Sequence, residues 1–270
     1  MTFYKMTGSG NDFVMLDGRL TTPEDWPTQR IVDLCDRRNG AGADGLVILT
    51  PEGEGTIRMT FFNSDGSAAA MCGNAALCST SLAGYLGMAT GQMRLATGAG
   101  TFPTRQTERK WESALNLPDF ALPGEVAIPL GSGEGVIWLA TVGVPHLTIL
   151  VHDVDNVDLT GRGRELRFHP ATGPAGANAN FVSSRKIDGV EHWFMRTYER
   201  GVEGETLACG TGAVASAVAL ATHERSHLPM KIVSRGGRVL TIEASLEAPV
   251  ARAVWLTGEG RLVYQGELAE

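Results

Sequence analysis

The 270-residue sequence predicts an α+β protein built from two similar halves. Strand-like segments are numerous, whereas each half contains one long helical segment of small and apolar residues. The two helical segments share a pattern at a constant offset of 209 − 72 = 137 residues, close to half the chain, which indicates internal duplication. This content argues against a doubly wound parallel sheet. The matched pairs are Cys72 and Cys209, Gly73 and Gly210, Ala76 and Ala213, and Ser79 and Ser216.

The second helical segment, Thr206 to Ala221, suggests chemistry as well as structure. Cys209 and the Gly-Thr-Gly that follows it open a run rich in alanine, which predicts a buried helix with the cysteine in its first turn. Backbone N–H groups there have no partner within the helix, so they favour an anion and lower a thiol pKa. A lone cysteine is usually a small core residue. Two matched cysteines at helix starts favour an acid–base pair instead.

Composition excludes several classes of function. The net charge of −7 and the lack of a basic run argue against binding to nucleic acid or to an anionic membrane. The amino terminus lacks the features of a signal peptide, and no apolar stretch is long enough to span a membrane. Four cysteines without a C-x-x-C pair predict neither a disulfide scaffold nor a metal site. We therefore expect a cytoplasmic protein with reduced thiols.

The first half reads as strands around one early helix. A helix is expected from Pro23 to Arg37. The segment Gly40 to Gly45 matches G-x-G-x-x-G, but a helix precedes it and a strand follows, so it is interpreted as a loop, close to substrate, and not as a dinucleotide site. Pro118 then opens the expected boundary between the halves. The expected strands are 3–6, 12–17, 46–49, 93–104 and 111–117, together with a turn-ended strand segment at 58–66.

The second half repeats this organisation, with the strands 136–142, 146–151, 178–182, 193–201, 231–234, 239–244, 251–256 and 262–265. Its polar residues leave alternatives open. His146 is equally a buried core histidine or a polar partner at a site. Asn178 and Asn180 are unusual in a strand, where asparagine is depleted. In the first half, Asn11 fits a turn residue better than a ligand-facing amide on local grounds.

Several motifs in order resemble diaminopimelate epimerase over almost the whole chain. They are Gly8-Ser-Gly-Asn-Asp-Phe13, Asn63-Ser-Asp-Gly-Ser67, Met71-Cys-Gly-Asn74, Gly143-x-Pro-His146, Asn178-x-Asn-Phe181, Tyr198-Glu-Arg-Gly and Ala208-Cys-Gly-Thr-Gly212. The resemblance implies two pseudo-symmetric domains, each a mostly antiparallel curled sheet around a central helix, with the active site in the cleft between them. The expected domains are residues 1–117 with 259–270, carrying Cys72, and 118–258, carrying Cys209.

The resemblance also implies a function. It predicts a cofactor-independent epimerase that interconverts L,L- and meso-2,6-diaminopimelate in lysine and peptidoglycan precursor synthesis, and that is a homodimer. Few lysines are present to form a Schiff base, and none lies in a recognisable cofactor loop, which agrees with the lack of a pyridoxal cofactor. The small-molecule substrate is then the only ligand expected.

Residue roles follow from the same resemblance. Cys72 and Cys209 are the expected acid and base. His146 and Glu199 are expected to hydrogen-bond to the thiols and tune them. The α-carboxylate is expected to contact Gly73, Asn74, Gly210 and Thr211. The distal amino-acid group is expected to contact Asn11, Asn63, Asn178 and Arg200.

Three positions depart from the family pattern. Ala75 and Leu77 replace the usual glycine and arginine after the first Cys-Gly-Asn, and Val144 replaces the usual asparagine of Gly-Asn-Pro-His. Val144 removes an amide that often contacts the distal end of the substrate, so a related cofactor-independent racemase, for instance one acting on histidine, is the alternative enzyme. A non-catalytic amino-acid-binding protein would not need both cysteines. A thiol redox sensor would use the same pair.

Overall fold

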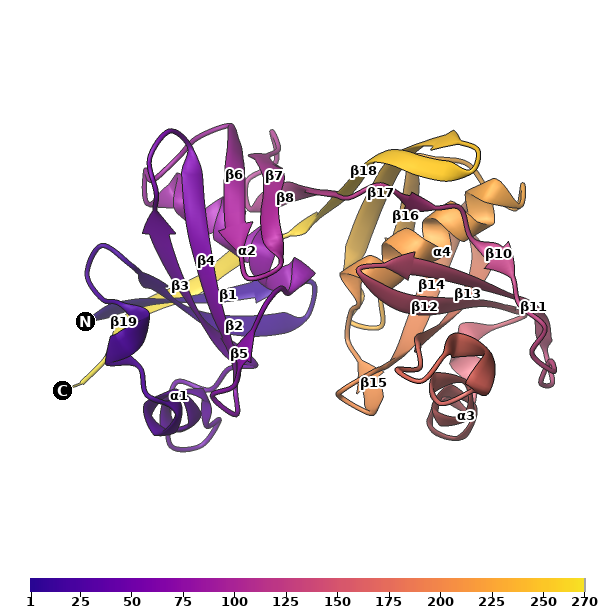
Figure 1. Cartoon of the computed structure of the whole chain (residues 1–270), viewed down its shortest axis with the longest axis horizontal. Coiled ribbons are helices and arrows are strands. Elements are labelled where there is room, and N and C mark those ends of the chain that lie inside the picture. The colour runs from indigo at the N-terminus through magenta and orange to yellow at the C-terminus, as the bar shows by residue number, and fades with distance from the viewer. Residues whose placement is uncertain (270) are drawn as a thin grey trace. The chain divides into compact units, whose positions relative to one another are not determined.

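A computed structural model describes residues 1–269 and divides the chain into two compact units (Figure 1). The first unit comprises Met1–Asn116 and Thr257–Glu270, and the second comprises Leu117–Leu256. The chain thus leaves the first unit once and returns to it with its last strand. Among the described residues, no helix is both long enough and apolar enough to cross a membrane.

The first unit is a mostly antiparallel sheet with one long helix. Its strands are β1 (Thr2–Gly8), β2 (Asn11–Asp17), β3 (Gly45–Pro51), β4 (Thr56–Asn63), β5 (Ala68–Ala69), β6 (Gln92–Thr97), β7 (Gly100–Gln106), β8 (Glu112–Leu117) and β19 (Arg261–Glu267). Strand β1 pairs antiparallel with both β19 and β2. The pairs β2–β3 and β4–β6 are parallel, while β3–β4, β6–β7 and β7–β8 are antiparallel. Helix α1 (Thr28–Cys35) connects β2 to β3, and α2 (Gly73–Tyr85) connects β5 to β6.

The second unit repeats this order of pairing. Its strands are β9 (Phe120–Ala121), β10 (Gly124–Glu125), β11 (Glu134–Val142), β12 (Val144–Val151), β13 (Asn178–Ile187), β14 (Val190–Glu199), β15 (Gly204–Thr206), β16 (Met230–Val233), β17 (Val239–Glu247) and β18 (Val250–Glu259). The pairs β12–β13 and β14–β16 are parallel, and β11–β12, β13–β14 and β16–β17 are antiparallel. Helix α4 (Gly210–Thr222) connects β15 to β16, and the short α3 (Arg164–Arg167) lies between β12 and β13.

The two units are therefore built on one plan, which confirms the predicted duplication and fold class. Strands β1 to β4 correspond to β11 to β14, the short β5 to β15, and β6 and β7 to β16 and β17. Helices α2 and α4 occupy the same step of the plan, the crossover between two parallel strands. A parallel pair requires such a crossover, and a helix packed on the sheet provides it.

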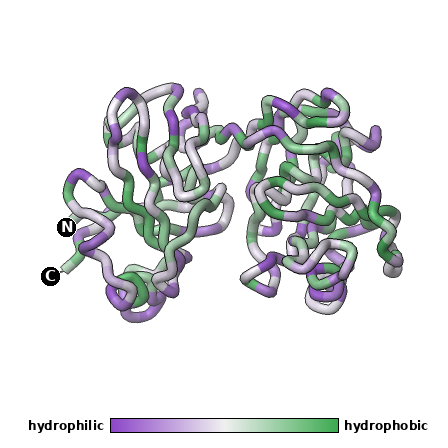
Figure 2. The backbone as a smooth tube through the Cα atoms, viewed as in Figure 1, coloured by the Kyte–Doolittle hydropathy of each residue, from purple (hydrophilic) through white to green (hydrophobic). Residues whose placement is uncertain are grey.

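Helices α2 and α4 are buried around most of their circumference. Ten residues of each helix are buried, from Asn74 to Ala83 in α2 and from Gly210 to Leu220 in α4. A helix that is apolar all round belongs inside a core. Helix α4 packs on β11, β12 and β17, and α2 packs on β1, β3 and β4. In Figure 2 the hydrophobic stretches of each unit run along its strands and helices, whereas the hydrophilic stretches lie mainly in connecting segments.

Close backbone approach fixes the start of α2. A Cβ atom added at Gly8 would lie 2.7 Å from the Asn74 carbonyl oxygen and 3.0 Å from Cys78 Sγ. A Cβ added at Gly260 would lie 2.5 Å from the Leu77 carbonyl oxygen. Two glycines thus let strand-end backbone reach the first turns of this helix.

The structure corrects two expected elements. The segment Pro23 to Arg37 is not one helix: a short 3₁₀ turn covers Pro23–Asp25, and α1 begins only at Thr28. Pro27 explains the break, because the residue before a proline is driven out of helical geometry, and Trp26 has φ −121° and ψ 72°. The single strand expected from Met93 to Thr104 is a hairpin, with β6 and β7 on either side of Gly98 and Ala99. The Gly40 to Gly45 segment is confirmed as a loop between a helix and a strand.

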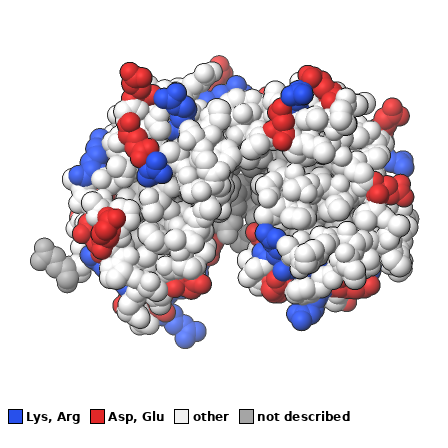
Figure 3. All heavy atoms as spheres, in the orientation of Figure 1, with Lys and Arg blue, Asp and Glu red and all other residues white. Residues whose placement is uncertain are grey.

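Charged residues are mixed over the surface. Figure 3 shows Lys and Arg interspersed with Asp and Glu on the face in view, without a field of one sign there. Many form ion pairs, such as Arg252 with Asp119 at 2.8 Å and Arg185 with Asp155 at 2.7 Å. Exposed pairs of this kind contribute about 0–1 kcal/mol each, so the apolar cores carry most of the stability.

We predict that Gly8→Ala destabilises the protein by about 1–3 kcal/mol, the usual cost of overpacking a core. The added methyl group would collide with the first turn of α2, as the distances above require. Equilibrium urea unfolding measures the change. Gly124→Ala is the matched control, because a Cβ at Gly124 meets no atom within 4 Å, and we expect it to change stability by less than about 0.5 kcal/mol. Equal stability of the two variants would contradict the close approach.

Candidate active site

Each long helix begins directly after one of the two matched cysteines. Cys72 precedes Gly73 with φ −144° and ψ 121°, and Cys209 precedes Gly210 with φ −126° and ψ 106°. Cys209 therefore lies one position before the first turn in which the sequence placed it. Neither cysteine side chain caps its helix, and the N–H groups in the first turn of a helix have no partner within the helix. Thr211 Oγ1 lies 3.8 Å from Cys209 Sγ.

The other two cysteines have the character of core residues. Burial raises the pKa of the Cys35 thiol to about 11. Burial also raises the pKa of Cys78 well above its ordinary value, and the nearby Cys72 and Glu259 add to this effect. A thiol with a raised pKa is rarely ionised, so little of the reactive thiolate is present. The structural role often assigned to cysteine thus applies to Cys35 and Cys78.

In the second unit, the strand register brings three expected site residues together. His146 pairs with Asn178 across β12 and β13. The Asn178 side-chain oxygen accepts a hydrogen bond of 2.7 Å from the backbone N–H of Arg200, which directly follows Glu199 at the end of β14. Helix α4 starts at the same step of the plan, after the short strand β15. His146, Asn178, Glu199 and Arg200 are therefore held at one end of this sheet, as is Cys209.

The first unit has the corresponding arrangement. Asn63 ends β4 and pairs with Gly45, the first residue of β3, while Asn11 begins β2. Asn63 Nδ2 donates to Ser67 Oγ at 3.0 Å within the turn that follows β4. The side chain of Asn11 is instead bound to the helix: Asn74 Nδ2 donates to Asn11 Oδ1 at 2.6 Å. These two asparagines thus lie on strand ends that correspond to those carrying Glu199 and Val144.

A carboxylate fixes the direction of the Asn11–Asn74 contact. Asn11 Nδ2 donates to Asp44 Oδ2 at 3.0 Å, and the backbone N–H of Asp12 donates to the same oxygen at 3.2 Å. An ionised carboxylate only accepts hydrogen bonds, so Asn11 must direct its nitrogen to Asp44 and its oxygen to Asn74. Asn74 must then direct its own nitrogen to Asn11. Asn74 Oδ1 remains, a buried acceptor without a hydrogen-bond partner in the structure.

Basic side chains form ion pairs with the carboxylates next to the Asn11–Asn74 contact. Arg37 pairs with Asp44 at 2.7 Å and with Asp12 at 2.6 Å, and Lys5 pairs with Asp12 at 2.6 Å. Burial of Asp12 acts to raise its pKa, but the hydrogen bonds and charges of Arg37 and Lys5 outweigh it, so the net pKa is lowered. Sequence reasoning did not assign roles to these residues. The only signal was the glycine-rich loop containing Asp44, which was placed close to substrate.

A second buried network surrounds His146. Asn180 Nδ2 lies 2.8 Å from the Leu147 carbonyl oxygen and 3.3 Å from His146 Nδ1, while Asn180 Oδ1 accepts from Thr197 Oγ1 at 2.9 Å. His146 is fully buried, and its Nε2 has no hydrogen-bond partner in the structure. Burial, aided by the positive charge of Arg200, lowers the pKa of His146 to about 3. The imidazole is therefore neutral at physiological pH.

The pKa of Glu199 is shifted in the opposite direction to that of His146. Burial raises the pKa of its carboxyl, and the nearby Thr206 side chain opposes the shift without cancelling it. Desolvation disfavours the charged form of any ionisable group, which is why a buried acid and a buried base move in opposite directions. Perturbed groups of this kind concentrate at functional sites.

The departures from the family pattern fall in two environments. Ala75 and Leu77 are fully buried within α2. Val144 begins β12, beside the glycine turn at Gly143, and is only partly buried. Ala75 and Leu77 are therefore packing residues. Val144 lies at the end of the sheet that carries the other expected site residues of the second unit.

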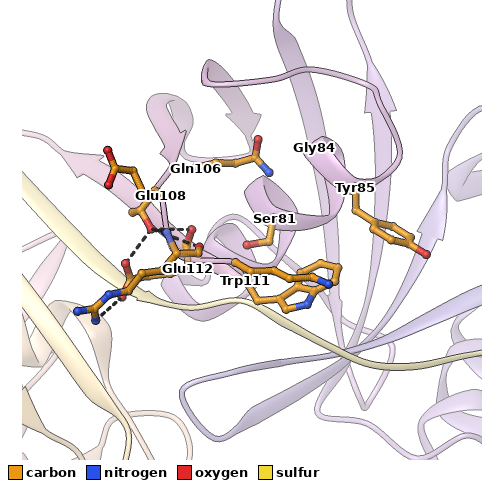
Figure 4. A pocket seen from close by; sticks show the side chains of 10 residues that line it. Ser81, Gly84, Tyr85, Gln106, Glu108, Trp111 and Glu112 are labelled. Atoms are coloured by element: carbon orange, nitrogen blue, oxygen red, sulfur yellow. Dashed lines mark hydrogen bonds and ion pairs between the residues drawn. The ribbon is translucent and has the colours of Figure 1, made fainter.

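A pocket of about 320 Å³ lies elsewhere in the first unit (Figure 4). It is lined by the last turns of α2, including Ser81 and Tyr85, and by residues 106–112. None of the expected site residues lines it. The pocket lies at the opposite end of α2 from Cys72.

The described residues contain no group of three or more His, Cys, Asp or Glu side chains arranged to hold a metal ion. Each unit thus provides a helix start, a thiol and buried amides, and the second unit also provides one imidazole, one carboxyl and one guanidinium. This set can move a proton and bind an anion.

The fold belongs to a class of two-unit α+β proteins that includes solved isomerase-like enzymes. A phenazine biosynthesis protein of the PhzF family from Bacillus anthracis matches with a TM-score of 0.75 at 14% identity, covering 100% of this chain and 99% of that one. A probable proline racemase from Agrobacterium radiobacter matches with a TM-score of 0.66 at 17% identity, covering 99% and 92%. Likeness at these identities concerns the fold.

Sequence comparison narrows the class to one family. The family model described as diaminopimelate epimerase matches residues 3–113 and 138–261. The diaminopimelate epimerase of Gemmatimonas aurantiaca is 48% identical over 280 residues, covering 100% of this chain and 99% of that protein. That of Aquifex aeolicus is 37% identical over 286 residues, covering 100% and 98%. The chain belongs to the diaminopimelate epimerase family.

The raised pKa of Glu199 predicts a pH-dependent stability. The folded state binds this proton more tightly than the unfolded state, so the contribution is fully present below the ordinary pKa of glutamate. It is lost as pH rises from that value through the raised pKa. Glutamine has no such proton to lose. The free energy of unfolding of Glu199→Gln should therefore rise relative to that of the wild type as pH increases across the same range.

Urea unfolding at a series of pH values measures the difference between Glu199→Gln and wild type. Glu191→Gln, an exposed carboxyl on the same strand, is the control. A Glu199→Gln profile parallel to that of the wild type would contradict the raised pKa.

Proposed function

We propose that this chain interconverts L,L- and meso-2,6-diaminopimelate by a two-base mechanism that uses Cys72 and Cys209 and no cofactor. The observation that carries the proposal is the pair of helix-start cysteines in a member of the diaminopimelate epimerase family. Lysine and peptidoglycan precursor synthesis would consume the product. Thiol chemistry of this kind needs reduced cysteines, which a cytoplasmic location maintains.

The proton inventory of the reaction is simple. A thiolate removes the α-proton from one face of the carbon, and the other thiol delivers a proton to the opposite face. The carbon inverts, one cysteine ends as thiol and the other as thiolate, and no net proton is taken up. The reverse reaction exchanges the two roles. Acid–base catalysis of this kind contributes about 10²- to 10⁴-fold to a rate.

The carbanionic charge that develops during the reaction is the main energetic obstacle, because an α-proton beside a carboxylate and an ammonium group is very weakly acidic. Backbone N–H groups at the starts of α2 and α4 suit the α-carboxylate, onto which this charge spreads. We assign this role to the backbone of Gly73, Asn74, Gly210 and Thr211. Fixed donors of this kind need no reorganisation as the charge forms.

The Asn74 side chain has a different role in this proposal. Its Oδ1 is a buried acceptor without a partner, and the Asp44–Asn11 contact prevents it from turning its nitrogen outward. An acceptor matches an N–H donor, so we assign Asn74 Oδ1 to an ammonium group of the substrate. The backbone N–H groups around it match a carboxylate. One residue would then recognise both charges of an amino acid.

The distal amino-acid group is assigned to Asn63, Asn178 and Arg200, with Asn11 acting through Asn74. A guanidinium suits a carboxylate because it can donate two parallel hydrogen bonds. His146 and Glu199 are assigned to tuning the thiols. A neutral imidazole and a carboxyl with a raised pKa can each donate a hydrogen bond to a thiolate, which lowers the pKa of that thiol.

Proton NMR in D2O tests the chemistry and the substrate together. Reduced enzyme is incubated with L,L-diaminopimelate without added cofactor, and histidine, lysine and glutamate are run in parallel. We expect loss of the α-proton signal and appearance of the meso isomer only with diaminopimelate. Exchange of histidine alone would transfer the substrate assignment to a related racemase and implicate Val144. No exchange with any of the four amino acids, from folded and reduced protein, would exclude the proposed enzyme.

Single variants of the two cysteines test the two-base assignment in the same assay. We expect Cys72→Ser and Cys209→Ser each to lower the rate of epimerisation at least about 10²-fold, because a hydroxyl is a far weaker acid than a thiol. Cys35→Ser, which changes a core thiol, is the matched control and should retain activity. Wild-type turnover by either of the first two variants would refute the assignment.

Mass spectrometry after mild oxidation reports a Cys72–Cys209 bridge and so tests the redox-sensor alternative.

We further propose a homodimer. Val263 and Tyr264, adjacent on β19, are 48% and 46% exposed, although both are large and apolar. As successive strand residues they point to opposite faces of the sheet, so each face of β19 exposes a large apolar side chain of the kind that a partner chain covers in an interface. We expect light scattering after size exclusion to give twice the mass of the chain, and Tyr264→Glu to shift it toward the monomer. Val239→Glu, at a residue 47% exposed in the other unit, should leave the mass unchanged. A monomeric wild type would exclude the dimer.

A further inference from the structure

The two units differ sharply on the sheet face covered by their long helices. In the second unit, His146 and Asn180 lie on this face, two residues apart in the β12–β13 register, and both are fully buried. The corresponding positions of the first unit are Phe13 and Val47, which are also buried. The fold that both units share therefore accepts apolar residues at these two positions. Burying polar groups there costs free energy unless they are well bonded, so the network of the second unit requires its own explanation.

The orientation of the Asn180 amide is determined by its neighbours. A carbonyl oxygen can only accept, and the Leu147 carbonyl lies 2.8 Å from Asn180 Nδ2. The reverse orientation would place two oxygens at that distance. The Thr197 hydroxyl donates to the Asn180 oxygen at 2.9 Å and reinforces the same choice. The nitrogen of Asn180 therefore faces His146.

This orientation determines which ring nitrogen of His146 carries the proton. The side-chain nitrogen of Asn180 has two N–H groups and cannot accept. One N–H is directed to Leu147, and the other to His146 Nδ1 at 3.3 Å. Nδ1 must therefore present its lone pair. Since the imidazole is neutral, its one proton lies on Nε2, the buried nitrogen that has no hydrogen-bond partner in the structure.

We propose that Asn180 is a positioning residue that holds His146 in its Nε2–H tautomer, so that His146 acts as a hydrogen-bond donor to an anionic group and not as a proton acceptor. The inference rests on the proposed function for the identity of the anion, a thiolate or a substrate carboxylate. It adds a residue to which neither the sequence nor the family resemblance assigned a role.

The network also borders the cysteine of the same unit. A Cβ atom added at Gly212, in the first turn of α4, would lie 2.2 Å from Asn180 Oδ1 and 3.1 Å from Cys209 Sγ. Gly212 is thus packed between the asparagine and the thiol. The absence of a side chain at Gly212 allows α4 to approach β13 closely enough for the two to be neighbours.

The tautomer can be measured without any assay of activity. Long-range ¹H–¹⁵N correlation NMR on protein labelled at histidine distinguishes a protonated from an unprotonated ring nitrogen, and His146→Gln assigns the signal among the six histidines. We expect wild-type His146 to carry its proton on Nε2 at pH 7 and to remain neutral at pH 5. Protonated Nδ1 in the wild type would overturn the proposal. This result does not depend on any variant of Asn180.

Asn180→Asp tests the cause. A carboxylate accepts only, so it should bind a proton on Nδ1 and convert His146 to the Nδ1–H tautomer or to imidazolium. Thr197→Val is the matched control: it removes a hydrogen bond from the same network but leaves the Leu147 contact, and it should retain the Nε2–H tautomer. An Asn180→Asp protein whose His146 keeps Nδ1 unprotonated would overturn the assignment to Asn180.

Turnover then separates this proposal from the function on which it rests. We expect Asn180→Asp to lower kcat about 10- to 100-fold with a smaller change in KM, the range found when partners that orient a metal-bound histidine are removed. Ser183→Ala, a buried polar change on the same strand, should leave kcat unchanged. Loss of the tautomer without loss of kcat would overturn the positioning role. An inactive wild type with the Nε2–H tautomer would refute the proposed enzyme and leave the tautomer assignment standing.

Discussion

The site depends on one constraint, a buried helix whose first turn is left without a side-chain cap. The crossovers β4–α2–β6 and β14–α4–β16 join parallel strands, so each helix must lie across its own sheet. Burial of the helix fixes its axis, and the helix start then falls beside the ends of the strands that flank the crossover. A cysteine at that start lies beside N–H groups that have no partner within the helix, and its side chain does not cap them. The helix start therefore favours residues that bind an anion or become one.

Two buried polar atoms among the expected site residues lack a hydrogen-bond partner in the structure. They are Asn74 Oδ1 and His146 Nε2. An unsatisfied buried group costs about 1–3 kcal/mol, a large share of a total stability of about 5–15 kcal/mol. Each of the two atoms is nevertheless held in one orientation by a hydrogen-bonded asparagine. An arrangement that only stabilised the fold would have placed apolar residues there, as Phe13 does at the position corresponding to His146.

Sequence reasoning succeeded where a local pattern determines structure. The apolar runs after Cys72 and Cys209, their constant offset and the turn residues around them were sufficient for the duplication and for both buried helices. It failed where a single residue interrupts a pattern, as Pro27 does in the expected helix and Gly98 in the expected strand. Boundaries depend on such residues more than on periodicity.

The side-chain networks could not be derived from the sequence, because their members are distant in it. Asp44 contacts Asn11 across 33 residues, Asn74 contacts Asn11 across 63, and Asn180 contacts His146 across 34. Two members carried a signal: Asp44 lies in the glycine-rich loop that was expected close to substrate, and Asn180 is an asparagine in the middle of an expected strand. Its role follows from the β12–β13 register and from the donor and acceptor character of its neighbours, which no single sequence reveals.

The same comparison of the units bears on substrate choice. Val144 and Asn11 occupy corresponding first positions of β12 and β2, but only Asn11 can transmit an orientation to a neighbouring amide. A site that hydrogen-bonds a substrate group rejects an analogue that lacks it far more strongly than an apolar site does. Under the proposed function, Val144 removes one such bond from the distal end, while the buried Ala75 and Leu77 remove none. On that proposal, discrimination among amino acids would rest on Asn178, Arg200 and the fixed acceptor of Asn74.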